Sequence, residues 1–177
     1  MESVFKTLRS WGLSCLLAWM VCWCVSCTIS VKFNGASIDY EKTKTIQIDN
    51  FPIRSAYVWA PMQSIFQTKL TDIYSTQTKL RQVRKNGDLQ LSGEITGFDQ
   101  YNKGISSNGY SSQVQLKMTV NVRFVNNKNH AEDFERQFSA TTEYDSSQQL
   151  TAVQEDLVTQ MVKDITDQIF NSTVANW

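Results

Sequence analysis

Cysteine is absent from the sequence after position 27, and histidine occurs only once, at His130. The four cysteines, Cys15, Cys22, Cys24 and Cys27, all lie near the amino terminus of the 177-residue chain. Zinc sites and disulfide frameworks need several such side chains in the folded part of a chain. The sequence after Cys27 therefore excludes both, and His130, in the polar run NNKNHAED, is interpreted as an exposed turn residue.

Catalytic and nucleotide-binding motifs are missing as well. The sequence contains no G-x-S-x-G elbow, no Walker A loop and no H-E-x-x-H pair. Basic and acidic side chains are equal in number, 17 each, so no net positive field selects nucleic acid. We therefore expect a protein that is not an enzyme, with no catalytic residue, metal, cofactor or nucleic-acid partner.

What the amino terminus does contain is a short cationic stretch followed by an apolar run. Lys6 and Arg9 precede residues 11 to about 25, which are almost entirely apolar. This pattern is typical of a secretory signal peptide. The alternative, a transmembrane anchor, needs about 20 apolar residues, and this run is shorter and gives way to polar, turn-rich sequence. We favour the signal peptide.

Cys27 is the cysteine best placed for lipidation. Signal peptidases require small side chains before the cut, and Cys27 alone combines a preceding Ser26 with a complete apolar segment, whereas Cys24 follows the bulky Trp23. The site resembles a bacterial lipobox, with cleavage between Ser26 and Cys27. Diacylglycerol and an N-acyl chain would give a stable three-chain anchor. We predict a signal peptide at 1–26, an anchored lead-in at 27–42 and one domain at 43–177.

Hydrophobic periodicity predicts the elements of that domain. We expect strands at 43–52, 114–125 and 132–144, a helix from Pro61 to about 77, a tight hairpin turn at Asn86-Gly87 between β-like runs in 80–98, and a helix from about 150 to 171. Thr151 and Gln154 fit a capping box for the last helix.

The strands and helices are all hydrophobic on one side only. In VQLKMTVNVRFV (114–125), for example, Val120 and its alternate neighbours point one way and the polar residues point the other. This predicts an α+β two-layer sandwich, with two helices packed on one face of a four- to five-stranded mixed, mostly antiparallel sheet. The other face of the sheet is then polar.

A basic segment and a long loop are the candidate surface features. Lys79, Arg81, Arg84 and Lys85, in KLRQVRK, form a cluster that fits phosphate or carboxylate groups, or that protects an edge strand from aggregation. The loop DQYNKGISSNGYSSQ (99–113) is long enough to be functional. Antiparallel connectivity places the basic segment and the loop at opposite ends of the sheet, so they are not expected to form one site.

Several segments together resemble a known family. These are KFNGASIDY, TKTIQIDNFP, NGDLQLSGEITGF, TTEYDSSQ and DLVTQMVKDITDQIFNSTVANW. In order and spacing they are similar to the lipopolysaccharide-assembly lipoproteins of the LptE family, in their Bacteroides-type form. The resemblance implies two helices on one face of a small sheet, in agreement with the fold expected from the residues.

The same resemblance implies the function. Members of this family are lipid-anchored at the outer membrane on its periplasmic side, plug the lumen of the LptD β-barrel as a heterodimer, assist its assembly and contact lipopolysaccharide on its way to the surface. Of the basic positions implicated in lipopolysaccharide contact in distant members, this sequence matches only Lys103. An autonomous periplasmic lipoprotein that binds a lipid or a glycan is the alternative.

Overall fold

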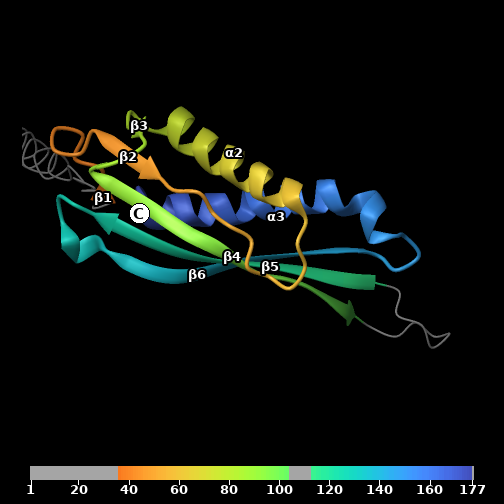
Figure 1. Ribbon diagram of the computed structural model, residues 1–177. Coiled ribbons are helices and arrows are strands. Elements are labelled where there is room, and N and C mark those ends of the chain that lie inside the picture. The colour runs from red at the N-terminus through yellow and green to blue at the C-terminus, as the bar shows by residue number, and fades with distance from the viewer. Residues whose placement is uncertain (1–35, 104–112, 177) are drawn as a thin grey trace, which may run out of the picture. The chain divides into compact units, whose positions relative to one another are not determined.

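The computed structural model describes residues 36–103 and 113–176, all within the compact unit Asn34–Trp177 (Figure 1). The predicted signal peptide, Ser26, Cys27 and most of the predicted loop 99–113 lie outside the described residues. The elements are β1 (Ala36–Ser37), β2 (Thr45–Ile48), α2 (Ala60–Gln77), β3 (Arg81–Val83), β4 (Leu89–Lys103), β5 (Gln113–Asn126), the 3₁₀ turn η1 (His130–Glu132), β6 (Phe134–Asp145), α3 (Leu150–Thr173) and β7 (Ala175–Asn176).

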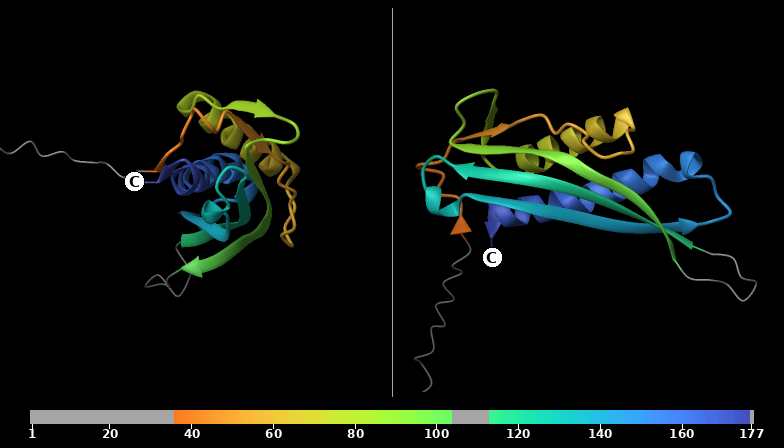
Figure 2. Two further views of the ribbon diagram at one scale, coloured as in Figure 1. Left: turned by 90° about the vertical axis from the view of Figure 1, so that its left-hand side faces the viewer. Right: turned by 60° about the horizontal axis from the view of Figure 1, so that its bottom comes forward.

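The main sheet has five strands in the order β3-β2-β4-β5-β6. Strand β2 is parallel to both of its neighbours, whereas β4, β5 and β6 are successively antiparallel. Both helices lie on the same side of this sheet (Figures 1 and 2), and β1 and β7 pair separately. The predicted two-layer α+β sandwich with a mixed sheet is confirmed.

The predicted hairpin at Asn86-Gly87 is wrong. Strands β3 and β4 are not neighbours, because β2 lies between them and is parallel to both. The connection passes so close to β2 that a Cβ on Gly87 would lie 2.6 Å from the backbone N of Gln47. Asn86 does adopt a positive φ of 56°, so the local turn signal is real. Pairing with a strand some 40 residues earlier, however, decides the topology.

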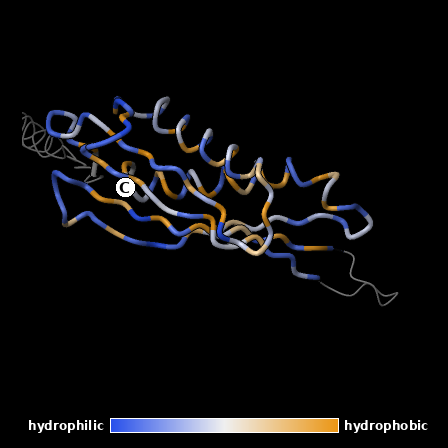
Figure 3. Tube along the Cα trace, viewed as in Figure 1, coloured by the Kyte–Doolittle hydropathy of each residue, from blue (hydrophilic) through white to orange (hydrophobic). Residues whose placement is uncertain are grey.

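The core lies between the helices and the sheet. On β5 the predicted inward face is confirmed, since Leu116, Met118, Val120 and Val122 are all fully buried. Hydrophobic and hydrophilic positions alternate along these strands (Figure 3). Such alternation buries one side of a strand and leaves the other side free. None of the described helices is both long and apolar enough to span a membrane.

Helix α3 buries a wider face than its predicted stripe. Val158, Val162 and Phe170 are buried, although the prediction did not include them. The reason is that α3 packs against α2 as well as against the sheet, as the edge-on contact between Phe170 and Tyr74 shows, with ring centroids 5.3 Å apart.

The predicted capping box of α3 is wrong. Gln149 is the N-cap residue and makes no side-chain cap bond. Gln154 is instead buried, and its Oε1 accepts a hydrogen bond from the Tyr57 hydroxyl at 3.1 Å. Its side chain therefore helps to hold the loop before α2 in place instead of capping its own helix.

Candidate functional site

The sheet face opposite the helices is an extended, mainly polar surface. Its central column is formed by alternate residues of β5, and the register places residues of β4 and β6 on either side. No described element covers this face (Figures 1 and 2). The same register also places Tyr101 and Val125 on this side. The other side chains are mainly amide, hydroxyl and charged, and this surface is named here the outer face: Ser92, Glu94, Asp99, Gln115, Lys117, Asn121, Arg123, Glu135, Gln137, Ser139 and Thr141.

Two polar contacts between described residues of the outer face and their neighbours are long. Gln137 Nε2 donates to Asn121 Oδ1 at 3.3 Å, and Arg54 lies 3.8 Å from the carboxylate of Glu94. A shallow hollow of about 230 Å³ lies between Glu94 and Arg123. This hollow is too small and open to enclose a typical ligand. The outer face as a whole can instead replace its hydrogen bonds to water with hydrogen bonds to a large polar partner.

The predicted basic residues are divided between the two ends of the sheet. Arg81 lies in β3, one of the two edge strands of the main sheet, and Arg84 and Lys85 follow it in the chain; all are exposed. Lys103 is the last residue of β4, whose first residue, Leu89, lies beside β2. At about 3.3 Å per residue the length of β4 separates the two ends by about 46 Å. Lys103 and the basic segment therefore do not form one site.

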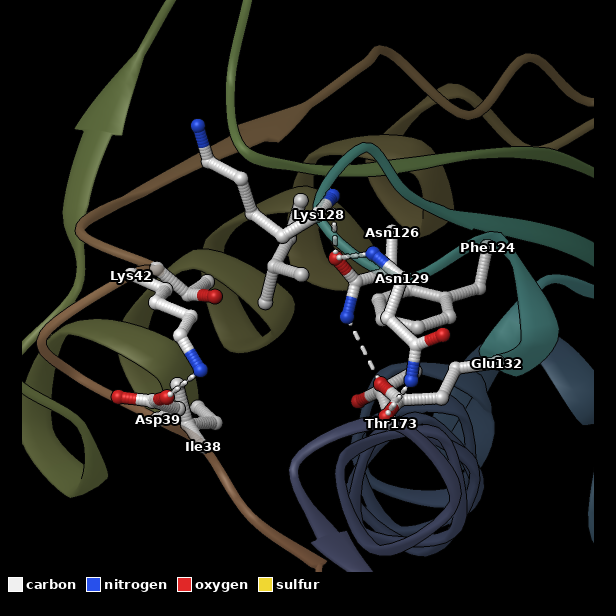
Figure 4. Close-up of a pocket in the computed structure, with 11 residues that line it drawn as sticks. Ile38, Asp39, Lys42, Phe124, Asn126, Lys128, Asn129, Glu132 and Thr173 are labelled. Atoms are coloured by element: carbon white, nitrogen blue, oxygen red, sulfur yellow. Dashed lines mark hydrogen bonds and ion pairs between the residues drawn. The ribbon is translucent and has the colours of Figure 1, made fainter.

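A cavity of about 430 Å³ lies at the end of the domain where β2 begins (Figure 4). Ile38, Leu89 and Phe124 contribute its apolar wall. Its polar groups bond to one another. The Lys42 ammonium lies 3.0 Å from Asp39, and the Glu132 carboxylate accepts from Asn126 Nδ2 and Asn129 Nδ2 at 2.7 and 2.8 Å. The bonds to Glu132 close the turn after β5, and the pair of Lys42 and Asp39 lies in the turn before β2. We therefore interpret the lining as structural.

Asp88 joins three segments beside this cavity. Its Oδ2 accepts from the backbone N–H groups of Lys44 and Thr45 at 2.9 and 3.0 Å and from the Thr45 hydroxyl at 2.9 Å. Its Oδ1 lies 2.9 Å from the Lys128 ammonium. The Lys128 hydrogen bond, followed by the Lys44 N–H, holds the pKa of Asp88 well below its usual range. No local signal in the sequence marks this residue, because its partners are about 40 positions away.

Replacement of Asp88 by Asn should make the free energy of unfolding less dependent on pH in the acidic range. Because the pKa of Asp88 is lowered by folding, its contribution is present above the ordinary value of 3.8 and is lost as the pH falls below it. Asp88→Asn should lower the free energy of unfolding at neutral pH by about 2 kcal/mol and flatten its decline in acid. Urea unfolding at several pH values measures this, with the exposed Asp164→Asn as control; equal profiles for both variants would contradict the prediction.

His130 lies in an exposed turn, as its sequence context predicts. Its Nδ1 is 3.0 Å from the Asp133 carboxylate. The backbone N–H of Asn126, followed by His130, lowers the pKa of Asp133. In the part of the chain that the structure describes, no three His, Asp or Glu side chains converge on a metal position.

A family model described as lipopolysaccharide-assembly, LptE, matches residues 43–173. The chain belongs to the LptE family. This membership covers both helices and all five strands of the main sheet, and it assigns the chain a general role in lipopolysaccharide assembly.

Solved structures of lipoproteins share the fold of this LptE-family chain at low identity. A minor lipoprotein from Acinetobacter baumannii is 14% identical, with 76% of this chain and 94% of that chain covered and a TM-score of 0.52. The rare lipoprotein B from Shewanella oneidensis is 12% identical, with 73% and 92% covered and a TM-score of 0.52. No curated protein sequence matches.

Proposed function

We propose that this LptE-family chain is an outer-membrane lipoprotein that plugs the lumen of the LptD β-barrel, assists its assembly and contacts lipopolysaccharide in transit to the cell surface. The observation that supports this most is the outer face. A sheet face lined with amides, hydroxyls and charges is costly to cover with an apolar surface, but it suits the interior of an outer-membrane barrel, which is polar.

The dimensions of the outer face fit such a lumen. Strands β4 and β5 contain 15 and 14 residues, so each extends about 45 to 50 Å at 3.3 to 3.4 Å per residue. The apolar band of an outer-membrane barrel is about 25 Å tall. A polar face of this length can therefore line the barrel wall over the full depth of the membrane.

The membrane anchor in this proposal is Cys27, with cleavage between Ser26 and Cys27. Cys27 lies nine positions before Ala36, the first residue of β1. Nine residues span at most about 32 Å when fully extended. The end of the domain that contains β1, β2 and β3 would then stay close to the periplasmic surface of the membrane.

The alternative of an autonomous lipid- or glycan-binding lipoprotein gains less support. It calls for a pocket whose polar groups converge on a ligand. The polar groups around the cavity of about 430 Å³ are already bonded to one another. We therefore retain the barrel partner as the proposal.

Extraction of the full chain in a mild detergent tests the function. We expect it to co-purify with the barrel as a heterodimer. A photo-cross-linking residue at Asn121, on the outer face, should give a covalent adduct with the barrel. Recovery of the chain only as a free monomer, with no adduct from Asn121, would contradict the proposal.

The anchor is tested separately by variants of two neighbouring cysteines. Cys27→Ser should abolish retention in the membrane, since it removes the attachment atom, whereas Cys24→Ser should leave retention unchanged. Mass spectrometry of the mature amino terminus should find a triacylated Cys27. An unmodified Cys27, or equal losses for both variants, would exclude this anchor.

A further inference from the structure

One edge of the domain carries five exposed basic side chains that come from two segments of the chain. These are Lys44, Lys79, Arg81, Arg84 and Lys85, named here the basic edge. The backbone N–H of Arg81 donates to the carbonyl of Lys44 at 2.9 Å, which brings the start of β2 beside the start of β3. Four of these residues are close neighbours in the sequence: Lys79, Arg81, Arg84 and Lys85. The fold adds Lys44 to this cluster.

The charges of the basic edge are not neutralised within the domain. In the described part of the chain none of the five forms an ion pair, whereas the nearby Lys42 and Lys128 are paired with Asp39 and Asp88. Exposed charges act over about 10 Å at 0.1 M salt. Five unpaired cations on one edge therefore attract an anionic surface that approaches it closely.

The basic edge lies at the same end of the domain as the entry of the amino-terminal segment. Lys44 follows β1 by only a few residues, and β1 pairs with β7 immediately after the end of α3. Helix α2, which precedes Lys79, also ends there, since the hydroxyl of Tyr74 is hydrogen-bonded to Thr173 near the end of α3. A tether leading back from β1 would hold this end, and not the end with Lys103, near its attachment point.

We propose that the basic edge docks on the anionic phospholipid surface of the membrane to which the chain is anchored and so sets the orientation of the domain. The inference rests on the proposed anchor at Cys27. The charges are spread along an open edge, which suits many separate phosphate groups in a plane better than a single bound ligand. Each basic residue at such a surface contributes about a fivefold gain in partitioning.

Fluorescence quenching of the cleaved, lipidated chain in vesicles tests the docking, because the proposed cleavage and lipidation leave it no other free thiol. A dye is attached through Gln77→Cys, at the end of α2 beside the basic edge, or through Ser64→Cys near the start of the same helix; both positions are exposed. The vesicles consist of phosphatidylcholine, with or without phosphatidylglycerol, and carry a quencher on a lipid headgroup. We expect phosphatidylglycerol to increase quenching at Gln77→Cys and not at Ser64→Cys.

Two matched triple variants decide the role of the charges. The first variant combines Arg81→Gln, Arg84→Gln and Lys85→Gln. It should remove the phosphatidylglycerol-dependent quenching, a loss of about a hundredfold in docking. The second, control variant combines Lys117→Gln, Arg123→Gln and Arg136→Gln. It removes the same types of charge from β5 and β6 and should leave the quenching unchanged. Circular dichroism melting checks that both variants stay folded.

Each other outcome overturns the inference in a distinguishable way. Quenching that is equal in both lipid mixtures, or equal in both triple variants, refutes docking by the basic edge. Self-association of the first triple variant with unchanged quenching would assign its charges to the protection of edge strand β3. A chain that fails to float with any vesicle instead contradicts the anchor at Cys27.

Discussion

Val120→Asp should unfold the domain. Val120 is fully buried and its neighbours in the register are Ile95 and Phe138, both of which also belong to the core. An aspartate there would place a carboxylate in an apolar interior without a partner, which costs several kcal/mol. Small domains are stable by only about 5 to 15 kcal/mol. We therefore expect a loss of about 5 kcal/mol or more, so that circular dichroism finds the variant largely unfolded without urea.

The adjacent residue supplies the control for this variant. Asn121 lies on the outer face, where its Oδ1 already accepts a hydrogen bond from Gln137. Asn121→Asp should change the free energy of unfolding by less than about 0.5 kcal/mol, as is usual at surface positions. Similar stability of the two variants would mean that β5 faces the opposite way from that described.

Gly93→Ala should have the second largest effect on stability. Gly93 lies in β4, and the fully buried ring of Phe51 packs over it. A Cβ at this position would lie 2.1 Å from the backbone O of Asn121 and 2.6 Å from Cε1 of Phe51. Because a backbone atom of the next strand cannot move away alone, we expect a loss of about 3 kcal/mol and a melting temperature lower by about 10 °C.

Gly97→Ala is the matched control, four positions further along β4. The atoms nearest to its Cβ belong to the side chains of Asp99 and Thr119 at 3.2 Å and beyond. These side chains can rotate, and Gly97 lies at an irregularity in the register where β4 is already distorted. Its melting temperature should fall by only a few degrees. An equal fall for both variants would show that loss of glycine, and not the contact with β5, causes the effect.

The elements that the sequence predicted best are those whose pattern is entirely local. The strict alternation around Val120 predicted both the length and the buried side of β5, because side chains of a strand point alternately to its two faces. The helix that begins near Pro61 was predicted for the same reason, with a repeat of three to four residues. The polar outer face followed from the same patterns, since the long strands place most of their apolar residues on the side that packs against the helices.

The predictions that were wrong concern positions where contacts with a distant segment of the chain override a local sequence preference. Asn86-Gly87 has the composition of a hairpin turn, yet β2 separates the strands on either side of it. Gln154 has the spacing of a capping residue, yet it is buried against Tyr57. In both cases burial and pairing with residues far away in the chain outweigh a preference that is worth about 1 kcal/mol or less.

The sequence by itself determined the class of the fold, the two helices α2 and α3, the buried side of each long strand and the membership of the LptE family. Only the tertiary structure decided that β2 lies between β3 and β4, that Asp88 joins three segments and that Lys44 completes the basic edge. The physical reason is the distance along the chain. Periodicity records which side of an element is buried, whereas the hydrogen bonds from Lys44 and Thr45 to Asp88 join residues more than 40 positions apart and form only when the whole sheet has assembled.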